Sequence, residues 1–274
     1  MTALLALLSS LVWGTSDFAA GIVAKRRPAA AVVGWSQALS LVVMTTLVLA
    51  SGELPDGSWP VWALLSGMSG ACALVCFYAA LSTGTMGVVA PIASLGVVVP
   101  VLLGVLGGEQ PSGVTWGGMA LAATGVLLAS GPELDAGLAR RPVLLACCAG
   151  LGFGITLYSL DRGGRSSIMH TLWGMRLTSV LLFAIVALVL RRAGGMTRRD
   201  VPALAFIGLA DLTANALFAY ASSYGYVSVA AVLGSLYPVV TALWAYAVLR
   251  ERLRPIQTAG VVVTMLGVVL IAAA

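Results

Sequence analysis

The sequence contains few charged residues. Only 9% of its 274 residues are charged, whereas 60% are hydrophobic. Soluble domains contain about 25% charged residues, so a soluble fold of this length would lack the polar side chains needed to cover its surface. The composition therefore excludes an ordinary soluble protein and predicts a chain whose main contact is the lipid bilayer.

Lysine, histidine and cysteine are also scarce. Because Lys25 is the only lysine and no G-x4-G-K-[ST] motif is present, ATP-driven transport by this chain alone is not expected. The GLGFG stretch at 150–154 lies inside an apolar run and predicts close helix packing rather than a nucleotide loop. We expect neither a metal site nor a cofactor, because the single histidine, His170, is far in sequence from the four cysteines, which are Cys72, Cys76, Cys147 and Cys148. The net charge of +5 comes from short arginine clusters and not from a basic stripe, so no nucleic-acid partner is expected.

Long apolar runs dominate the sequence. A helix needs about 20 apolar residues to cross the hydrocarbon core, and backbone groups in lipid must be satisfied within their own segment. The sequence therefore predicts an all-α membrane protein with ten transmembrane helices. The first run lacks a basic leading region and is expected to be a retained helix. The predicted spans are approximately 2–24, 30–50, 60–81, 88–107, 113–130, 143–161, 167–190, 201–223, 228–249 and 256–273.

The two halves of the chain resemble each other. When the sequence is shifted by about 141 residues, SLGVVVP (94–100) falls on SLYPVVT (235–241), and Glu109 falls on Glu251. Because five helices are an odd number, the second copy must enter the membrane from the opposite side, and the halves are predicted to be inverted repeats. The predicted organisation is a first five-helix repeat at 1–130, a connecting loop at 131–142 and a second five-helix repeat at 143–274.

The basic residues are distributed unevenly between the two ends of the predicted helices. The loops after helices 1, 3, 5, 7 and 9 contain most of the lysine and arginine residues, whereas the loops after even-numbered helices contain Arg162 and Arg165. Cytoplasmic loops are enriched in these residues, so the charge count places both termini outside the cytoplasm. An even number of helices places both termini on one side in either orientation.

Several motifs occur at corresponding places in the two halves. The chain resembles EamA-type members of the drug/metabolite transporter superfamily over nearly its whole length. The motifs that carry the resemblance are WG-x3-F at Trp13, Gly14 and Phe18, a proline-containing helix ending in a Glu turn at Pro100–Glu109 and Pro238–Glu251, and a G-x6-G helix at Gly118/Gly125 and Gly260/Gly267.

This resemblance implies a ten-helix basket built from two inverted five-helix units. It implies export, or sometimes uptake, of small polar metabolites such as amino acids without use of ATP. It also implies that both termini lie in the cytoplasm, which is opposite to the charge count. Many relatives carry an arginine in the second helix, whereas this chain has Gln37 there and places Arg176 in helix 7.

Ionisable residues deep inside the predicted spans are Asp17, His170, Arg176 and Asp211. A charge at the bilayer centre costs about 2.5–3.5 kcal/mol on insertion scales, so each should face the protein interior or a wet cavity. Asp17 is interpreted either as a proton- or substrate-amine-binding group or as a carboxylate that caps a bent helix. Arg176 and Asp211, on consecutive helices, are expected either to form a buried ion pair or to bind substrate through Arg176. His170 is interpreted either as a group that titrates near neutral pH or as a residue at a helix end, and the second interpretation is favoured.

Uncharged residues complete the candidate site. Mid-span aromatic residues can line a cavity while forming hydrogen bonds, although packing is the more common role for any one of them. Prolines in helices 4 and 9, at equivalent places in the two halves, point to a binding site between the repeats. The substrate- or proton-binding candidates are Asp17, Trp13, Gln37, Tyr78, Arg176, Asp211, Asn215 and Tyr237, and the helix-break or gating candidates are Pro91, Pro100 and Pro238.

The family resemblance, together with the spans and repeats, predicts a multi-pass secondary transporter of the cell membrane. We expect it to act as a monomer or homodimer and to export small polar metabolites such as amino acids by alternating access, with protons as a possible coupling ion. Uptake of a small metabolite is an alternative. An intramembrane enzyme acting on lipids is disfavoured, because the loops contain scattered carboxylates and no histidine. A channel is also disfavoured, since two inverted halves provide no obvious ring of equivalent groups.

Overall fold

The computed structural model describes residues 1–53, 55–84, 86–134, 140–191, 194–249 and 255–273. Within these ranges every regular element is a helix and no strand occurs, which confirms the all-α prediction for this part of the chain. The elements are α1 (Thr2–Ala24), α2 (Ala29–Ser51), α3 (Trp59–Thr83), α4 (Met86–Ser94), the 3-10 helix η1 (Leu95–Val97), α5 (Val98–Leu106), α6 (Gly113–Leu134), α7 (Arg140–Leu190), α8 (Val201–Ser223), α9 (Val227–Gly234), α10 (Tyr237–Leu249) and α11 (Pro255–Ala273).

Long apolar helices make up most of the structure. Among the described residues, six helical stretches are long and apolar enough to cross a membrane, judged by length and composition. Their sides expose many large hydrophobic residues, which is the surface that contact with lipid tails requires. The six stretches are Thr2–Ala24, Ala29–Ser51, Trp59–Thr83, Arg141–Val189, Val201–Ser223 and Val227–Val248.

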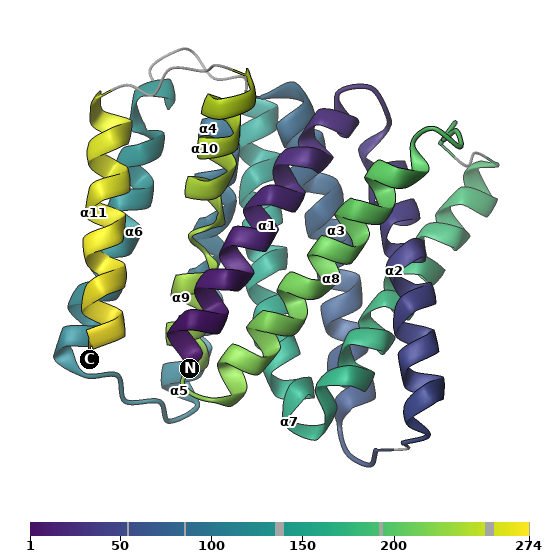
Figure 1. Cartoon of the computed structure of the whole chain (residues 1–274), viewed down its shortest axis with the longest axis horizontal. Coiled ribbons are helices and arrows are strands. Elements are labelled where there is room, and N and C mark those ends of the chain that lie inside the picture. The colour runs from purple at the N-terminus through teal and green to yellow at the C-terminus, as the bar shows by residue number, and fades with distance from the viewer. Residues whose placement is uncertain (54, 85, 135–139, 192–193, 250–254, 274) are drawn as a thin grey trace.

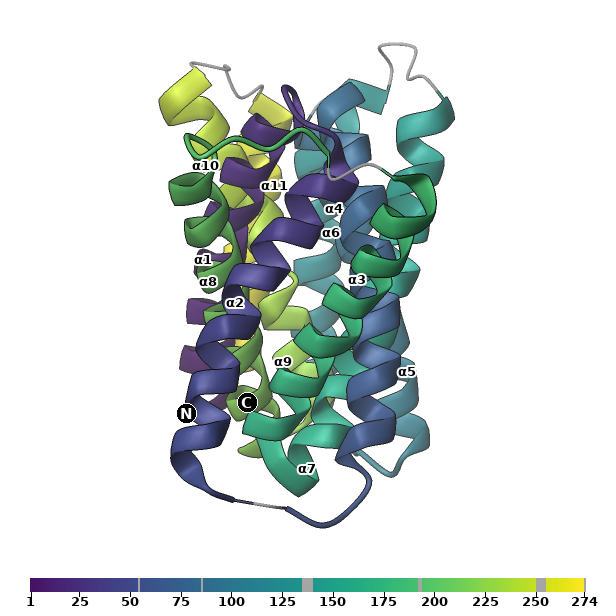
Figure 2. The same cartoon turned by 90° about the vertical axis from the view of Figure 1, so that its right-hand side faces the viewer.

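The helices stand side by side in one bundle (Figures 1 and 2). Here α1 packs along α8, α3 packs along α7, and α6 pairs with α11 at one edge of the bundle (Figure 1). Because each of these pairs joins the first half of the chain to the second, the two halves share one interior. Figure 1 also shows the start of α1 and the end of α11 at the same end of the bundle.

The α7 element differs from the sequence-based prediction. A loop was expected between spans at 143–161 and 167–190, yet the segment is helical except at Ser167, whose φ of −161° and ψ of 114° are extended. Both ends of α7 lie at the same end of the bundle in Figure 1, so the chain reverses direction at this residue. The polar residues expected in a loop are satisfied within the helix instead, because Arg165 pairs with Asp161 at 3.1 Å and Arg162 Nε donates to the Tyr158 hydroxyl at 2.9 Å.

Two further segments depart from regular α-helix near the centre of the bundle. The 3-10 turn η1 separates α4 from α5, and α9 ends two residues before α10 begins. Pro100 follows the first break and Pro238 follows the second, where each lacks the N–H that a regular helix would direct to Gly96 or Gly234. Pro91, in contrast, lies inside α4 and away from the break, and its side chain is outside those described.

The first break packs directly against α7. A Cβ atom on Gly96 would collide with the backbone carbonyl oxygen of Gly150, and one on Gly154 would collide with the carbonyl oxygen of Gly96. The GLGFG stretch is thus a close helix contact, as its small residues predicted. This contact places the irregular backbone of η1 in the interior, beside the side chains of α7.

Candidate functional site

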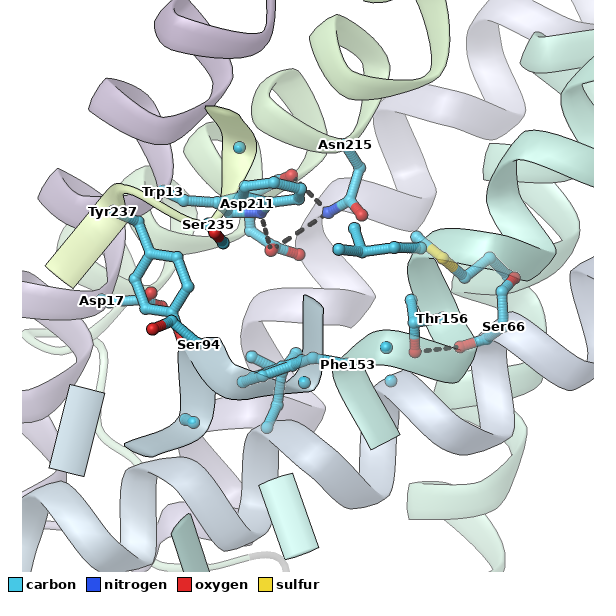
Figure 3. Close-up of a pocket in the computed structure, with 18 of the residues that line it drawn as sticks. Trp13, Asp17, Ser66, Ser94, Phe153, Thr156, Asp211, Asn215, Ser235 and Tyr237 are labelled. Atoms are coloured by element: carbon cyan, nitrogen blue, oxygen red, sulfur yellow. Dashed lines mark hydrogen bonds between the residues drawn. The ribbon is translucent and has the colours of Figure 1, made fainter. Parts of the chain in front are cut away.

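A cavity lies between the two halves of the chain (Figure 3). Its volume is about 740 Å³, including the part that is open to solvent. The lining comes from α1, α2, α3, the α4–η1 segment, both arms of α7, α8 and the α9–α10 segment. The lining residues are Trp13, Asp17, Gln37, Ser66, Gly70, Leu74, Ala93, Ser94, Gly96, Val97, Phe153, Gly154, Thr156, Leu157, Met175, Arg176, Ser179, Asp211, Asn215, Gly234, Ser235 and Tyr237.

The carboxylate of Asp211, on α8, collects four hydrogen bonds at one wall of this cavity. Its Oδ1 accepts from Trp13 Nε1 at 3.2 Å and from Asn215 Nδ2 at 3.1 Å (Figure 3). Its Oδ2 accepts from Gln37 Nε2 at 3.3 Å and from Arg176 Nη1 at 2.7 Å. Because Asp211 is only 7% exposed, these four donors replace the water that would otherwise solvate its charge.

Arg176, on the second arm of α7, is the positive partner of this carboxylate. The sequence predicted that the two residues would either pair or act on substrate, and the structure shows the pair, with 2.7 Å between Nη1 and Oδ2. The same Nη1 also donates to Gln37 Oε1. The side chain is 2% exposed, and its Nε and Nη2 groups have no hydrogen-bond partner among the described residues.

Asp17 lies at another part of the lining, one helical turn after Trp13 on α1. Figure 3 shows it beside Tyr237, which comes from the start of α10. Asp17 is 7% exposed, and its carboxylate interacts with the hydroxyl of Tyr78 on α3. Tyr78 itself is almost fully buried and does not line the cavity. Among the residues that the structure describes, no arginine or lysine forms a salt bridge with Asp17.

Tyr237 connects the two broken segments. Its hydroxyl donates to the backbone oxygen of Ala90, on α4, at 3.4 Å. Its ring packs edge-on against Phe77 of α3, with 6.0 Å between ring centroids. This residue therefore lines the cavity and also holds α10 against α4.

His170 lies away from the cavity, at the turn between the arms of α7. Its Nδ1 is 3.0 Å from Ser167 Oγ, its Nε2 is 3.1 Å from the Glu53 backbone oxygen, and its ring packs on Trp59. The backbone N–H of His170 also donates to Ser167 Oγ, which is the bonding of a helix N-cap. This is the helix-end position that the sequence favoured.

Sequence reasoning did not identify the hydroxyl-bearing part of the cavity. Ser66 of α3 and Thr156 of α7 face each other there, with the Thr156 hydroxyl 3.5 Å from the Ser66 backbone oxygen (Figure 3). Thr156 also bonds within its own helix, to the Gly152 carbonyl at 2.8 Å. Serine and threonine in apolar helices commonly make such local bonds, so the sequence carries no signal that separates these two from the others.

A second contact between the halves, missed from the sequence, involves Glu109 just after α5. Its two carboxylate oxygens accept hydrogen bonds from the backbone N–H groups of Val227 and Ser228, at 2.6 and 3.2 Å. These groups open α9, whose first N–H groups have no partner within the helix. The Glu turn of the first half thus caps a half-helix of the second. Its counterpart, Glu251, lies outside the described residues.

The comparisons with known proteins decide the family. A sequence profile of the EamA-like transporter family matches residues 1–131 and 140–273. The chain belongs to this family. The resemblance to EamA-type transporters predicted from the motifs is thereby confirmed, and as a member of the EamA family this chain is a multi-pass membrane transporter of the drug/metabolite transporter superfamily.

The fold is also found among solved structures. One crystal structure of another protein superposes on this EamA protein with a TM-score of 0.79, at 18% sequence identity, over 98% of this chain and 95% of the other. At this identity the likeness concerns the fold alone. No curated protein matches the sequence.

Proposed function

We propose that this EamA protein is a secondary transporter that exports small polar metabolites, such as amino acids, by alternating access. In this proposal the chain makes ten membrane crossings, with the arms of α7 as separate spans and each broken segment as one span. The units 1–130 and 143–274 form the two inverted repeats, joined by residues 131–142. Both termini lie on one side of the membrane, which the common position of the α1 start and the α11 end in Figure 1 supports.

The observation that carries the proposal is the buried ionic cluster at a cavity lined by both halves. Asp17, Arg176 and Asp211 are each at most 7% exposed, and all three line the cavity. Ionisable groups at membrane depth are costly and mark substrate or ion pathways. In transporters with inverted repeats such groups gather at the repeat interface, next to discontinuous helices. The η1 break and the α9–α10 break border the same cavity, through Gly96 and Gly234.

Proton coupling is assigned to Asp17 in this proposal. The Asp211 carboxylate is neutralised by Arg176 and accepts hydrogen bonds from three further donors, which are Trp13, Gln37 and Asn215. Asp17 faces the cavity without a basic partner among the described contacts. It is therefore the carboxylate whose charge can be balanced by an entering proton or by a substrate ammonium group.

Counterflow in liposomes tests the transport proposal. Purified protein is reconstituted, the vesicles are preloaded with one member of a panel of amino acids and related metabolites, and entry of the labelled compound is followed. We expect saturable exchange for at least one class of compound. No exchange by folded protein across the whole panel would contradict a metabolite transporter.

Substitution of Asp17 tests its role in coupling. We expect Asp17→Asn to lower exchange at least about tenfold and to remove its pH dependence, because the amide cannot take up a proton or balance an ammonium group. The matched control is Asp56→Asn, which changes an exposed carboxylate between α2 and α3. Wild-type rate and pH profile in Asp17→Asn would show that Asp17 is not the coupling residue.

A further inference from the structure

Only one of the three guanidinium nitrogens of Arg176 forms hydrogen bonds with described residues. All of its observed hydrogen bonds come from Nη1, which donates to Asp211 and to Gln37. Nε and Nη2 are buried and have no hydrogen-bond partner within the described part of the chain. Buried N–H groups are nearly always paired, because an unpaired one loses its hydrogen bonds to water without replacement, and the loss is greater when the group is charged. Arg176 is also one of the residues that line the cavity, so two unpaired groups on this side chain require a physical reason.

The two free groups form a single binding edge. In a planar guanidinium, Nε–H and the adjacent Nη2–H point in parallel on the side away from Nη1. This edge matches the two oxygens of a carboxylate and binds them through two parallel, charge-assisted hydrogen bonds. Lysine cannot reproduce this geometry, because an ammonium group presents a single point of charge.

The surrounding residues hold this edge in place. The Asp211 carboxylate and the side-chain oxygen of Gln37 both accept hydrogen bonds from Arg176 Nη1. The side-chain nitrogen of Gln37 in turn donates to Asp211. Trp13 of α1 and Asn215 of α8 donate hydrogen bonds to Asp211 and so hold its carboxylate in place. Contacts from α1, α2 and α8 therefore fix the orientation of the guanidinium group. Preorganised groups lose little freedom when a ligand binds, so the free edge is suited to ligand binding rather than to structural support alone.

We infer that the Nε–Nη2 edge of Arg176 is the subsite that binds a carboxylate group of the transported substrate. This inference rests on the proposed function and deepens it by naming the substrate class as carboxylates. A bound carboxylate would satisfy both unpaired groups with charge-assisted hydrogen bonds, whereas an ammonium group has no acceptor and the oxygens of a sugar or a carboxamide are neutral, weaker acceptors. Gln37 and Asp211 act as positioning residues, because they orient Arg176 through its other nitrogen.

Ligand-dependent thermal stability of the purified full-length protein in detergent tests this subsite without requiring transport. The probes are the twenty L-amino acids, lactate and succinate, each compared with its carboxamide, for example L-leucine with L-leucinamide. Binding to the folded state raises Tm with ligand concentration. We expect at least one carboxylate to raise Tm in a saturable manner, and its carboxamide to bind about tenfold more weakly or not at all, because it lacks the charge that strengthens hydrogen bonds to the guanidinium.

Two variants of the pair assign the effect to Arg176. Arg176→Lys keeps the charge opposite Asp211 but lacks the edge, so we expect affinity for the carboxylate to fall about tenfold or more. If this variant does not fold, Arg176→Gln with Asp211→Asn removes both charges together and should lose the carboxylate-induced Tm shift. The matched control is Arg162→Lys, in the same helix element but outside the cavity lining, which should keep wild-type affinity.

The outcomes separate the subsite from the transport proposal. Equal binding of acid and carboxamide, unchanged affinity in Arg176→Lys, or no binding of any carboxylate in the panel would each overturn the subsite. If one of these results is obtained and compounds that lack a carboxylate show saturable counterflow, the subsite is wrong but the transport proposal is supported. Arg176-dependent binding of a carboxylate without any counterflow would support the subsite and contradict transport.

Discussion

At the scale of single residues, Asp211 is the centre of the polar interior. It pairs with Arg176 and accepts from Trp13, Asn215 and Gln37, which come from α1, α8 and α2. An ion pair in a low-dielectric interior need not add net stability compared with apolar residues. Removal of one partner, however, leaves an uncompensated buried charge, which is strongly destabilising.

A comparison of single and double variants tests this residue-scale argument. We expect Asp211→Asn to destabilise the protein by about 3–5 kcal/mol, because Arg176 keeps its charge without an anion. The double variant Arg176→Gln with Asp211→Asn should be less destabilised than that single variant. Thermal unfolding in detergent measures both. Additive losses in the double variant would show that the two side chains are not energetically coupled.

At the scale of elements, the two broken segments are held by contacts from the opposite half. Glu109, after α5, caps the N-terminus of α9, and η1 lies against α7 through Gly96 and Gly150. Short half-helices have few internal hydrogen bonds, so such contacts decide whether they stay formed. The short helices beside the cavity are therefore stabilised by tertiary contacts with other elements.

The Glu109 cap gives a prediction about α9. Glu109→Ala removes both acceptors and leaves the N–H groups of Val227 and Ser228 unpaired, which should cost about 0.5–2 kcal/mol. We expect faster amide hydrogen exchange in peptides that cover α9, measured by mass spectrometry, with α2 peptides as the internal reference. Unchanged exchange in α9 would show that the cap does not stabilise this helix.

The close contact at η1 gives a second element-scale prediction. Gly96→Ala places a methyl group on the Gly150 carbonyl oxygen, so the backbone of η1 or α7 must shift. We expect a loss of at least about 1–3 kcal/mol, as for other overpacked sites. Gly117→Ala is the matched control, because a Cβ at this helical glycine meets nothing within 4 Å. Equal melting temperatures for the two variants would contradict the close packing.

At the scale of the whole molecule, an ion pair joins the two halves at one end of the bundle. Arg27, in the α1–α2 connection, pairs at 2.8 Å with Asp200, which precedes α8. The backbone N–H and the hydroxyl of Thr197 donate to the same Asp200 oxygen, each at 2.8 Å. These hydrogen bonds, together with Arg27, hold the pKa of Asp200 below its usual value.

This lowered pKa predicts how stability depends on pH. The pKa of an aspartate in an unfolded chain is about 4. Because the folded pKa is lower, the contribution of Asp200 is complete above about pH 4 and is lost as the pH falls through the folded pKa. We expect wild type to melt higher than Asp200→Asn at neutral pH, with the difference shrinking on acidification. A difference in Tm between wild type and Asp200→Asn that stays constant down to about pH 3 would contradict the prediction.

The sequence by itself determined the class of the molecule. Composition and long apolar runs required helices in lipid, because a helix satisfies its backbone groups within one continuous apolar segment. The motif order identified the EamA family, and the rarity of charges within the spans singled out Asp17, Arg176 and Asp211. Each of these conclusions depends on composition or on the spacing of residues in the sequence. None of them requires knowledge of which distant residues are in contact.

Only the tertiary structure decided which of these residues meet. It brought Gln37 to Arg176 and Trp13 to Asp211, and it buried Tyr78 outside the cavity lining. It also showed that two guanidinium nitrogens of Arg176 have no partner among the residues described. Whether a buried polar group is satisfied depends on groups from other helices. That dependence is a property of packing in three dimensions, and no spacing within one helix contains it.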